Sequence, residues 1–238
     1  MVLKNLIHVP YIGIYLLLYA RKNDRHSDQQ KYDFLKKIVN YANRGGNVKI
    51  VSSGQELLPE KNGFILYPNH QGMYDMLAII DSFGRPVSAI LKKEVANVPF
   101  VKQVRTIMRA LPMDREDVRQ SMKVILQAAK EVGEGRNYVI FAEGTRSRNG
   151  NQLLNFKGGS FKAAMKAKCP IVPVALINSF VPFDSDSLET VTVQVHYLKP
   201  ISYEEYKDMK TNEIAVMVKE RIQQKINEET KVKSYGTE

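Results

Sequence analysis

The sequence predicts an α/β fold in which a central sheet is flanked by helices. From Asn47 onward, short apolar runs typical of strands alternate with longer segments of helical periodicity, and this alternation is typical of a sheet packed between helices. Two of the strand-like runs end in polar segments, as reactive groups often do in α/β proteins. The 238 residues suffice for one good core, so we expect one α/β domain at 47–238, preceded by an N-terminal unit at 1–46.

The N-terminal unit is predicted to hold two helices that lie at a membrane surface. Residues 9–20 are an apolar run followed by a basic cluster, and the run is shorter than the roughly 20 residues that a spanning helix needs. Residues 28–44 place Tyr32 and Leu35 on one face of an amphipathic helix, a pattern that fits packing on a core as well as membrane contact. Residues 1–50 hold nine Lys or Arg and three Asp. This excess favours an anionic bilayer or another polyanion, and the two helices in tandem favour a membrane anchor.

The remaining elements follow from periodicity and from turn residues. Strands are predicted at 48–52, 63–67, 86–91, 137–141, 171–176 and 190–198, and helices at 73–82, 98–110, 116–134, 159–168 and 212–229. Pro112 and its neighbours are expected to end the helix at 98–110 before the helix at 116–134 begins. The buried stripe of the helix at 116–134 is predicted to consist of Val118, Met122, Ile125, Leu126 and Ala129.

The strand at 63–67 leads into Asn69-His70-Gln71-Gly72-Met73-Tyr74-Asp75. A neutral imidazole can take a proton from a hydroxyl near pH 7, and a carboxylate on its other nitrogen fixes the tautomer and stabilises the imidazolium. Residues five apart inside one helix point about 140° away from each other. We therefore place His70 in a loop and Asp75 in the first turn of the next helix. The pair by itself also fits a structural role.

A second polar segment, Glu143-Gly144-Thr145-Arg146, also follows a predicted strand. Gly144 lets backbone N–H groups turn toward a ligand, Thr145 adds a hydroxyl donor, and Arg146 offers the planar fork that matches a phosphate. These residue types predict a phosphate site, in which Glu143 is expected to hold an arginine in place rather than to touch the substrate. Taken alone, the tetrapeptide also fits an ordinary polar turn.

Cysteine and histidine usage narrows the chemistry further. Cys169 is the single cysteine, lies in apolar surroundings and is predicted to be a structural thiol. No Cys/His cluster has metal-ligand spacing, so no metal site is expected. The sequence contains no Gly-x-Ser-x-Gly elbow, ribonucleoprotein motif or phosphate-binding P-loop, which disfavours a serine hydrolase and nucleic-acid or nucleotide partners. His8, His26 and His196 stand outside any motif.

The two polar segments, about seventy residues apart, resemble motifs of the glycerolipid acyltransferase family, and above all of its bacterial members that act on lysophosphatidic acid. Two further blocks strengthen the resemblance, which covers about residues 47–200. Lys92-Lys93-Glu94, Val98-Pro99-Phe100 and Pro112-Met113-Asp114-Arg115 resemble the block whose basic residues help to bind the acceptor phosphate. Ile171-Val172-Pro173-Val174-Ala175 resembles the block associated with acyl binding and the shape of the site. The chain departs from the family pattern at Ala110, where many members have glycine, and at Leu111-Pro112-Met113.

The resemblance implies a glycerol-3-phosphate acyltransferase-like fold with a central mixed sheet and an N-terminal membrane-surface helix pair. It implies transfer of a fatty acyl group from an acyl thioester to the sn-2 hydroxyl of lysophosphatidic acid, giving phosphatidic acid. Another lysolipid acceptor, or a lipid esterase, is the alternative. The implied roles are general-base catalysis by His70 with Asp75, phosphate binding by Glu143, Gly144, Thr145, Arg146, Arg115 and Lys92, and acyl-site shape from Val172, Pro173 and Val174.

The same resemblance implies the partners and the location. The acyl donor is expected to be acyl carrier protein or coenzyme A thioester, used as a co-substrate, and no cofactor is expected. The anionic surface of the membrane is an expected partner and nucleic acid is not. We expect a peripheral or monotopic protein at the cytoplasmic face of the cell membrane.

Overall fold

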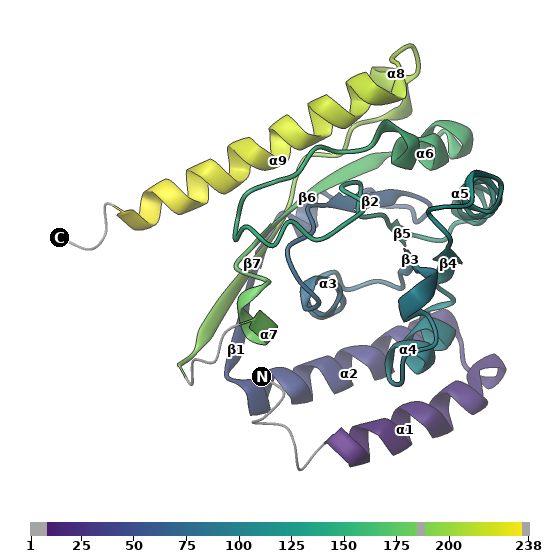
Figure 1. The fold of residues 1–238 in the computed structure, drawn as a ribbon, viewed down its shortest axis with the longest axis vertical. Coiled ribbons are helices and arrows are strands. Elements are labelled where there is room, and N and C mark those ends of the chain that lie inside the picture. The colour runs from purple at the N-terminus through teal and green to yellow at the C-terminus, as the bar shows by residue number, and fades with distance from the viewer. Residues whose placement is uncertain (1–8, 185–188, 235–238) are drawn as a thin grey trace.

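A computed structural model describes residues 9–184 and 189–234. The described residues form a seven-stranded sheet in the order β1-β7-β6-β2-β5-β3-β4, with helices on both faces (Figure 1). The strands are β1 (Val48–Ser53), β2 (Ile65–Pro68), β3 (Ser88–Lys92), β4 (Leu111–Met113), β5 (Tyr138–Val139), β6 (Ile171–Ile177) and β7 (Val191–Tyr197). The helices are α1 (Val9–Arg21), α2 (Asp28–Gly46), α3 (Asp75–Ser82), α4 (Val101–Met108), α5 (Val118–Gly133), α6 (Lys162–Ala167), α7 (Val181–Asp184), α8 (Tyr203–Tyr206) and α9 (Thr211–Ser234).

The sheet is mixed, as the family resemblance implied. Strand β2 pairs in parallel with β5 and with β6, and β3 pairs in parallel with β5 and with β4. Strand β7 runs antiparallel to β6 and parallel to β1. The carboxyl ends of β2, β3, β4, β5 and β6 therefore share one edge of the sheet, which is where α/β proteins place their ligands.

Two hydrophobic cores cover the two faces of the sheet. Leu66 of β2 belongs to the core shared with α2 and α3, and its neighbour Ile65 belongs to the core shared with α5, α6 and α9. Both side chains are fully buried. A strand that is apolar at successive positions is typical of a sheet covered on both sides. Figure 1 shows α1 and α2 along the bottom of the molecule, with α5, α6 and α9 across the sheet from them.

The N-terminal helix pair divides between the core and the surface. Tyr32 and Leu35 of α2 are buried in the first core, so this helix uses its apolar face for packing, which the sequence pattern left open. Helix α1 buries Leu16 but exposes most of its other large apolar side chains. Within the described residues, no helix combines the length and the apolar character needed to span a bilayer. The membrane role of the pair stays a prediction.

Local signals explain where the helices begin and end. Ser27 and Gln30 form a capping box at the start of α2, in which each side chain satisfies an otherwise unpaired backbone N–H. The helix ends at Gly46, the last residue of the predicted N-terminal unit, and Asn47 at its C-cap adopts a φ of 53°. Asp117 caps α5 by accepting hydrogen bonds from two backbone N–H groups of its first turn.

The secondary structure differs from the sequence prediction at β4 and at two short helices. Residues 111–113 form β4 rather than a simple break. Pro112 is accepted there because β4 is the edge strand, where a missing N–H leaves no ladder partner unsatisfied. In addition, α7 and α8 are helices of four residues that the periodicity did not reveal.

The predicted buried stripe of α5 was wrong at three of its five positions. The side chains of Val118, Met122 and Leu126 are 78%, 36% and 46% exposed, whereas Ile125 and Ala129 are buried as predicted. The helix carries two apolar stripes at helical spacing. It packs through the stripe that contains the small residues, because alanines allow close approach to α6. The buried residues of α5 are Val124, Ile125, Ala128, Ala129 and Val132.

Candidate active site

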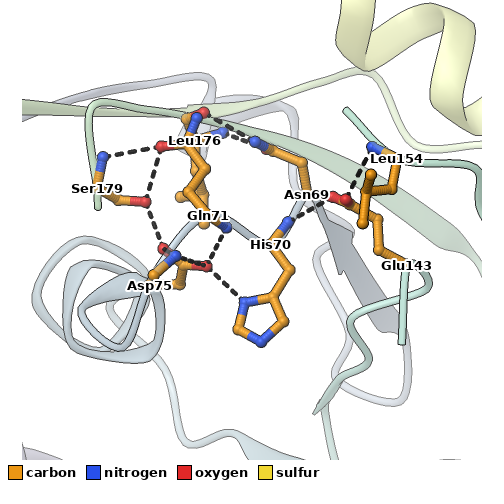
Figure 2. A network of polar contacts seen from close by, with 9 residues as sticks. Asn69, His70, Gln71, Asp75, Glu143, Leu154, Leu176 and Ser179 are labelled. Carbon is orange, nitrogen blue, oxygen red and sulfur yellow. Dashed lines mark hydrogen bonds and ion pairs between the residues drawn. The ribbon is translucent and has the colours of Figure 1, made fainter. Parts of the chain in front are cut away.

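His70 and Asp75 form a hydrogen-bonded pair at the carboxyl edge of the sheet. His70 lies in the loop after β2, and Asp75 is the first residue of α3, as predicted. The His70 Nδ1 atom lies 2.7 Å from Asp75 Oδ2 (Figure 2). The Asp75 side chain is 1% exposed and that of His70 is 20% exposed. Because Nδ1 faces the carboxylate, Nε2 is the nitrogen that can accept a proton from a substrate.

The Asp75 carboxylate is held by donors from its own loop and from the segment after β6. The backbone N–H of Gln71 donates to Oδ2 at 2.7 Å, and that of Gly72 reaches both oxygens at 3.1 Å. The Ser179 hydroxyl donates to Oδ1. A side chain at Gly72 would meet the backbone of Phe180, with a Cβ only 2.8 Å from its Cα. The glycine therefore lets the loop pack closely on the segment after β6.

Sequence reasoning missed Gln71 and Ser179, which complete this network. The Gln71 Oε1 atom accepts a hydrogen bond from the Ser179 N–H at 2.9 Å, and the Ser179 hydroxyl oxygen, whose proton goes to Asp75, lies 3.0 Å from the same atom. Gln71 also donates through Nε2 to Asn151 Oδ1 at 2.8 Å. The one available signal was that Ser179 follows the carboxyl end of β6, which shares its edge with β2.

Glu143 braces the loop of His70 from the other side. Its carboxylate accepts the His70 N–H at 2.7 Å through Oε1 and the Leu154 N–H at 2.9 Å through Oε2 (Figure 2). The expectation that Glu143 holds an arginine was therefore wrong, because both oxygens bind backbone N–H groups. Burial raises the pKa of Glu143, and the two backbone donors oppose that effect.

The two predicted loops meet directly. The backbone N–H of Ser147 donates to the His70 carbonyl at 2.8 Å. Gly144 has a φ of +73°, in the region that favours glycine, and its carbonyl accepts a hydrogen bond from the Arg115 side chain. Arg146 is half-buried and Thr145 is exposed in the same turn. The guanidinium of Arg115 thus lies at this turn, although the two are about thirty residues apart in the sequence.

The remaining predicted site residues lie at the same edge or in the sheet behind it. Lys92 ends β3, and its ammonium lies 3.4 Å from Glu94. Val172, Pro173 and Val174 are buried in β6, and their role in the shape of an acyl site stays a prediction. The His70 ring stacks on Phe141, with 4.2 Å between ring centroids. Sequence reasoning also missed Lys157, whose ammonium would lie 3.0 Å from a Cβ at Gly144.

Nothing in the described residues forms a group of three or more metal-binding side chains. Cys169 is buried, and burial raises the pKa of its thiol to about 12, as a structural thiol requires. His196 is buried and bonded to Ser53 and Gln194, and His8 lies outside the described residues. The fold and the site together define an α/β enzyme with a histidine–carboxylate pair at the carboxyl edge of its sheet.

The comparisons with known proteins name the family. A family model described as Acyltransferase matches residues 49–177, which is more than half of the chain. The chain therefore belongs to the acyltransferase family, and the resemblance inferred from its motifs is confirmed.

Two curated relatives and one solved structure show how far the similarity extends. The 1-acyl-sn-glycerol-3-phosphate acyltransferase of Escherichia coli is 32% identical over 171 residues, 71% of this chain and 69% of the relative. The enzyme of that name from Borreliella burgdorferi is 36% identical over 132 residues, 56% of this chain, and the match spans about half of the relative (52%). The structure of the 1-acyl-sn-glycerophosphate (LPA) acyltransferase PlsC from Thermotoga maritima aligns with a TM-score of 0.75 at 20% identity, covering 94% of this chain and 93% of that one. That likeness confirms the predicted fold.

Proposed function

We propose that this protein transfers a fatty acyl group from an acyl thioester to the sn-2 hydroxyl of lysophosphatidic acid, giving phosphatidic acid for phospholipid synthesis. The observation that carries the proposal is the direct contact between the two loops. The backbone N–H of Ser147, which follows the turn predicted to bind phosphate, donates to the carbonyl of His70. One small headgroup can therefore meet both the base and the turn. The names of the Escherichia coli and Borreliella burgdorferi relatives support the same reaction.

In the proposed reaction His70 is the general base. Its Nδ1–H donates to Asp75, and Nε2 takes the proton from the acceptor hydroxyl as that oxygen attacks the thioester carbonyl carbon. The carbon–sulfur bond then breaks, and the proton on His70 passes to the thiolate. The products are the new ester and a free thiol. Because the thioester is already activated, the hydroxyl can attack it without the help of a cofactor.

Phosphate anchoring supplies the positioning that the base alone does not. General-base help is worth about 10²–10⁴ in rate, and correct placement of the hydroxyl adds to it. Arg146 is the proposed main phosphate ligand, with the N–H groups around Gly144, the Thr145 hydroxyl, Arg115 and Lys92 in support. The contact of Arg115 with the Gly144 carbonyl supports this assignment.

The proposed location is the cytoplasmic face of the cell membrane, with α1 at the headgroup level. Its exposed large apolar side chains are Tyr11, Ile14, Tyr15, Leu17 and Leu18, and aromatic and aliphatic groups next to basic residues suit that region. Lysophosphatidic acid would then be taken from the bilayer.

The experiment is an acceptor panel with purified protein. Lysophosphatidic acid and lysolipids with larger headgroups are each offered with a coenzyme A thioester or a carrier-protein thioester, and the ester products are separated and quantified. We expect the highest kcat/KM for lysophosphatidic acid. A preference for another lysolipid would replace the acceptor, and release of free fatty acid without any acceptor would identify an esterase.

A further inference from the structure

The solvent-facing side of α5 and α6 carries a concentration of positive charge. The segments 118–130 and 157–168 contain seven Lys or Arg and no Asp or Glu. We call the exposed side chains of these two segments the basic face. Its charged members, all exposed, are Arg119, Lys123, Lys130, Lys157, Lys162, Lys166 and Lys168.

Most of this charge is not neutralised within the described part of the chain. Lys130 lies 3.8 Å from Glu134, whereas no ion pair is found there for Arg119, Lys123, Lys162 or Lys166. Like charges gathered on one surface repel each other and attract an acidic partner. The basic face therefore has the electrostatic character of a docking surface.

The basic face also contains the apolar stripe of α5 that the sequence analysis assigned to the core. Val118, Met122 and Leu126 follow one another at intervals of four residues and are exposed, so the stripe extends over about 12 Å of helix. Arg119 and Lys123 lie beside it on the same helix. An apolar strip with a charged rim is the usual composition of a protein–protein interface.

The basic face begins at the mouth of the active site. Arg115, three residues before Val118, donates to the Gly144 carbonyl, and Lys157 approaches Gly144. Helices α5 and α6 cover the second core, whereas α1 lies over the first, on the opposite face of the sheet (Figure 1). A flat bilayer that contacts α1 would leave the basic face in water.

We propose that the basic face docks an acidic carrier protein that presents the acyl thioester on a flexible phosphopantetheine arm. The proposal rests on the proposed function and names the donor partner of the same site. Unpaired lysines select an acidic surface, and the stripe offers contact for an apolar patch beside it. The arm would reach His70 from the aqueous side, while the lipid acceptor enters from the side of α1. A coenzyme A thioester has no protein surface and makes no use of the stripe.

The test compares two donors carrying the same acyl chain, one on acyl carrier protein and one on coenzyme A, with lysophosphatidic acid as acceptor. One double variant, Lys123→Glu with Lys166→Glu, reverses charge on the basic face. A second, Met122→Gln with Leu126→Gln, removes its apolar stripe. The control, Lys49→Glu with Lys210→Glu, changes the net charge equally at exposed positions outside the basic face.

For both face variants we expect the KM of the carrier-protein donor to rise about tenfold, with the KM of the coenzyme A donor changed by less than about twofold and kcat unchanged. The control should leave both KM values unchanged. Added salt should raise the KM of the carrier-protein donor in the wild type and less in the charge-reversal variant.

Several outcomes would overturn the proposal. Equal effects on both donors, or none on either, would remove the docking role. Weaker sedimentation of the charge-reversal variant with anionic vesicles would make the face a membrane contact. A wild-type protein that uses only coenzyme A thioesters would refute the carrier partner and leave the proposed function standing, whereas no turnover with either donor would refute the function itself.

Discussion

Asp75 receives hydrogen bonds from His70, from two backbone N–H groups of the intervening loop, and from Ser179. A carboxylate bound on both oxygens has one orientation available, and it passes this constraint to the imidazole. The remaining freedom of His70 is limited by the ring of Phe141. The imidazole of the proposed base is thus held in place before any substrate binds, which is the condition for efficient proton transfer.

Replacing His70 with alanine removes the proposed base. For His70→Ala we expect kcat to fall by about 10²–10⁴, with the circular dichroism spectrum and the sedimentation with vesicles unchanged, because the side chain is partly exposed and outside the core clusters. The initial rate of phosphatidic acid formation measures the effect. Wild-type activity in a folded variant would exclude the proposed mechanism.

Ser179 is predicted to act as a positioning residue through Asp75. Since hydrogen bonds to charged groups contribute about 1.5–3 kcal/mol, Ser179→Ala should lower kcat by about tenfold or more and leave the KM for lysophosphatidic acid unchanged, and Ser179→Thr should restore part of the rate. The control Ser82→Ala removes a hydroxyl bonded to Ala78 and Tyr197 at the other end of α3. If both alanine variants lower kcat equally, the specific role is refuted.

Arg146 is predicted to act on binding of the acceptor. Loss of a charge-assisted contact to phosphate should raise the KM for lysophosphatidic acid about tenfold or more in Arg146→Ala, with a smaller change in kcat. Steady-state kinetics at a saturating concentration of donor separates the two constants. Arg221→Ala on α9 removes an arginine outside the site and serves as the control. An unchanged KM would transfer the phosphate role to other residues.

At the scale of elements, the N-terminal helices have different surroundings although both have apolar faces. Helix α2 begins at a capping box and buries Tyr32 and Leu35 in the first core. Helix α1 packs next to α4, where Gly13 leaves room for the ring of Phe100 at 3.2 Å from a Cβ position. The outer side chains of α1 are exposed. This difference from α2 is the basis of the membrane prediction for α1.

Acidic substitutions on α1 test that prediction. Tyr15→Asp with Leu18→Asp places two charges among exposed apolar side chains, so binding to anionic vesicles should weaken about tenfold or more, because apolar burial is lost and the new charges repel the lipid headgroups. Vesicle sedimentation measures the change. Val216→Asp on the exposed side of α9 is the control. Unaltered sedimentation of the α1 variant would show that this helix is not the membrane contact.

For the whole molecule, the parallel strands bring distant segments together at one edge. Glu143 joins the loops after β2 and β5 by accepting backbone N–H groups from His70 and Leu154. This carboxyl group is buried, so its contribution to stability depends on pH as well as on contacts. Linkage gives the sign, because a group with a raised pKa binds its proton more tightly in the folded state.

The raised pKa of Glu143 predicts that ionising this group costs stability. Its contribution should decline as pH rises above the ordinary value of 4.5 and through the raised pKa. Glu143→Gln lacks the titration, so as the pH rises from the ordinary value of 4.5 through the raised pKa, the free energy of unfolding of the wild type should fall relative to that of the variant. Urea unfolding at several pH values measures both. Parallel pH profiles for the two proteins would contradict the prediction.

Much of the fold could be predicted because the strands and most helices carry strong local patterns. The loop position of His70 followed from helix geometry, and the turn around Gly144 followed from its residue types. Phosphate binding by that turn stays a prediction. Strand β4 was missed because Pro112 argues against a strand in isolation and is accepted only at an edge of the sheet. The α5 stripe was assigned wrongly because both stripes of this helix have the same spacing, and only its packing against the sheet and α6 selects one of them.

The sequence by itself determined the alternation of strands and helices, the histidine–aspartate pair and the family, because each depends on residues close together in the chain or on motifs in order. The tertiary structure alone decided which groups hold that pair. Ser179 lies 104 positions beyond Asp75, and Glu143 lies 73 positions beyond His70 and bonds to backbone rather than to an arginine. Contacts at such separations are set by strand order, which no local pattern encodes.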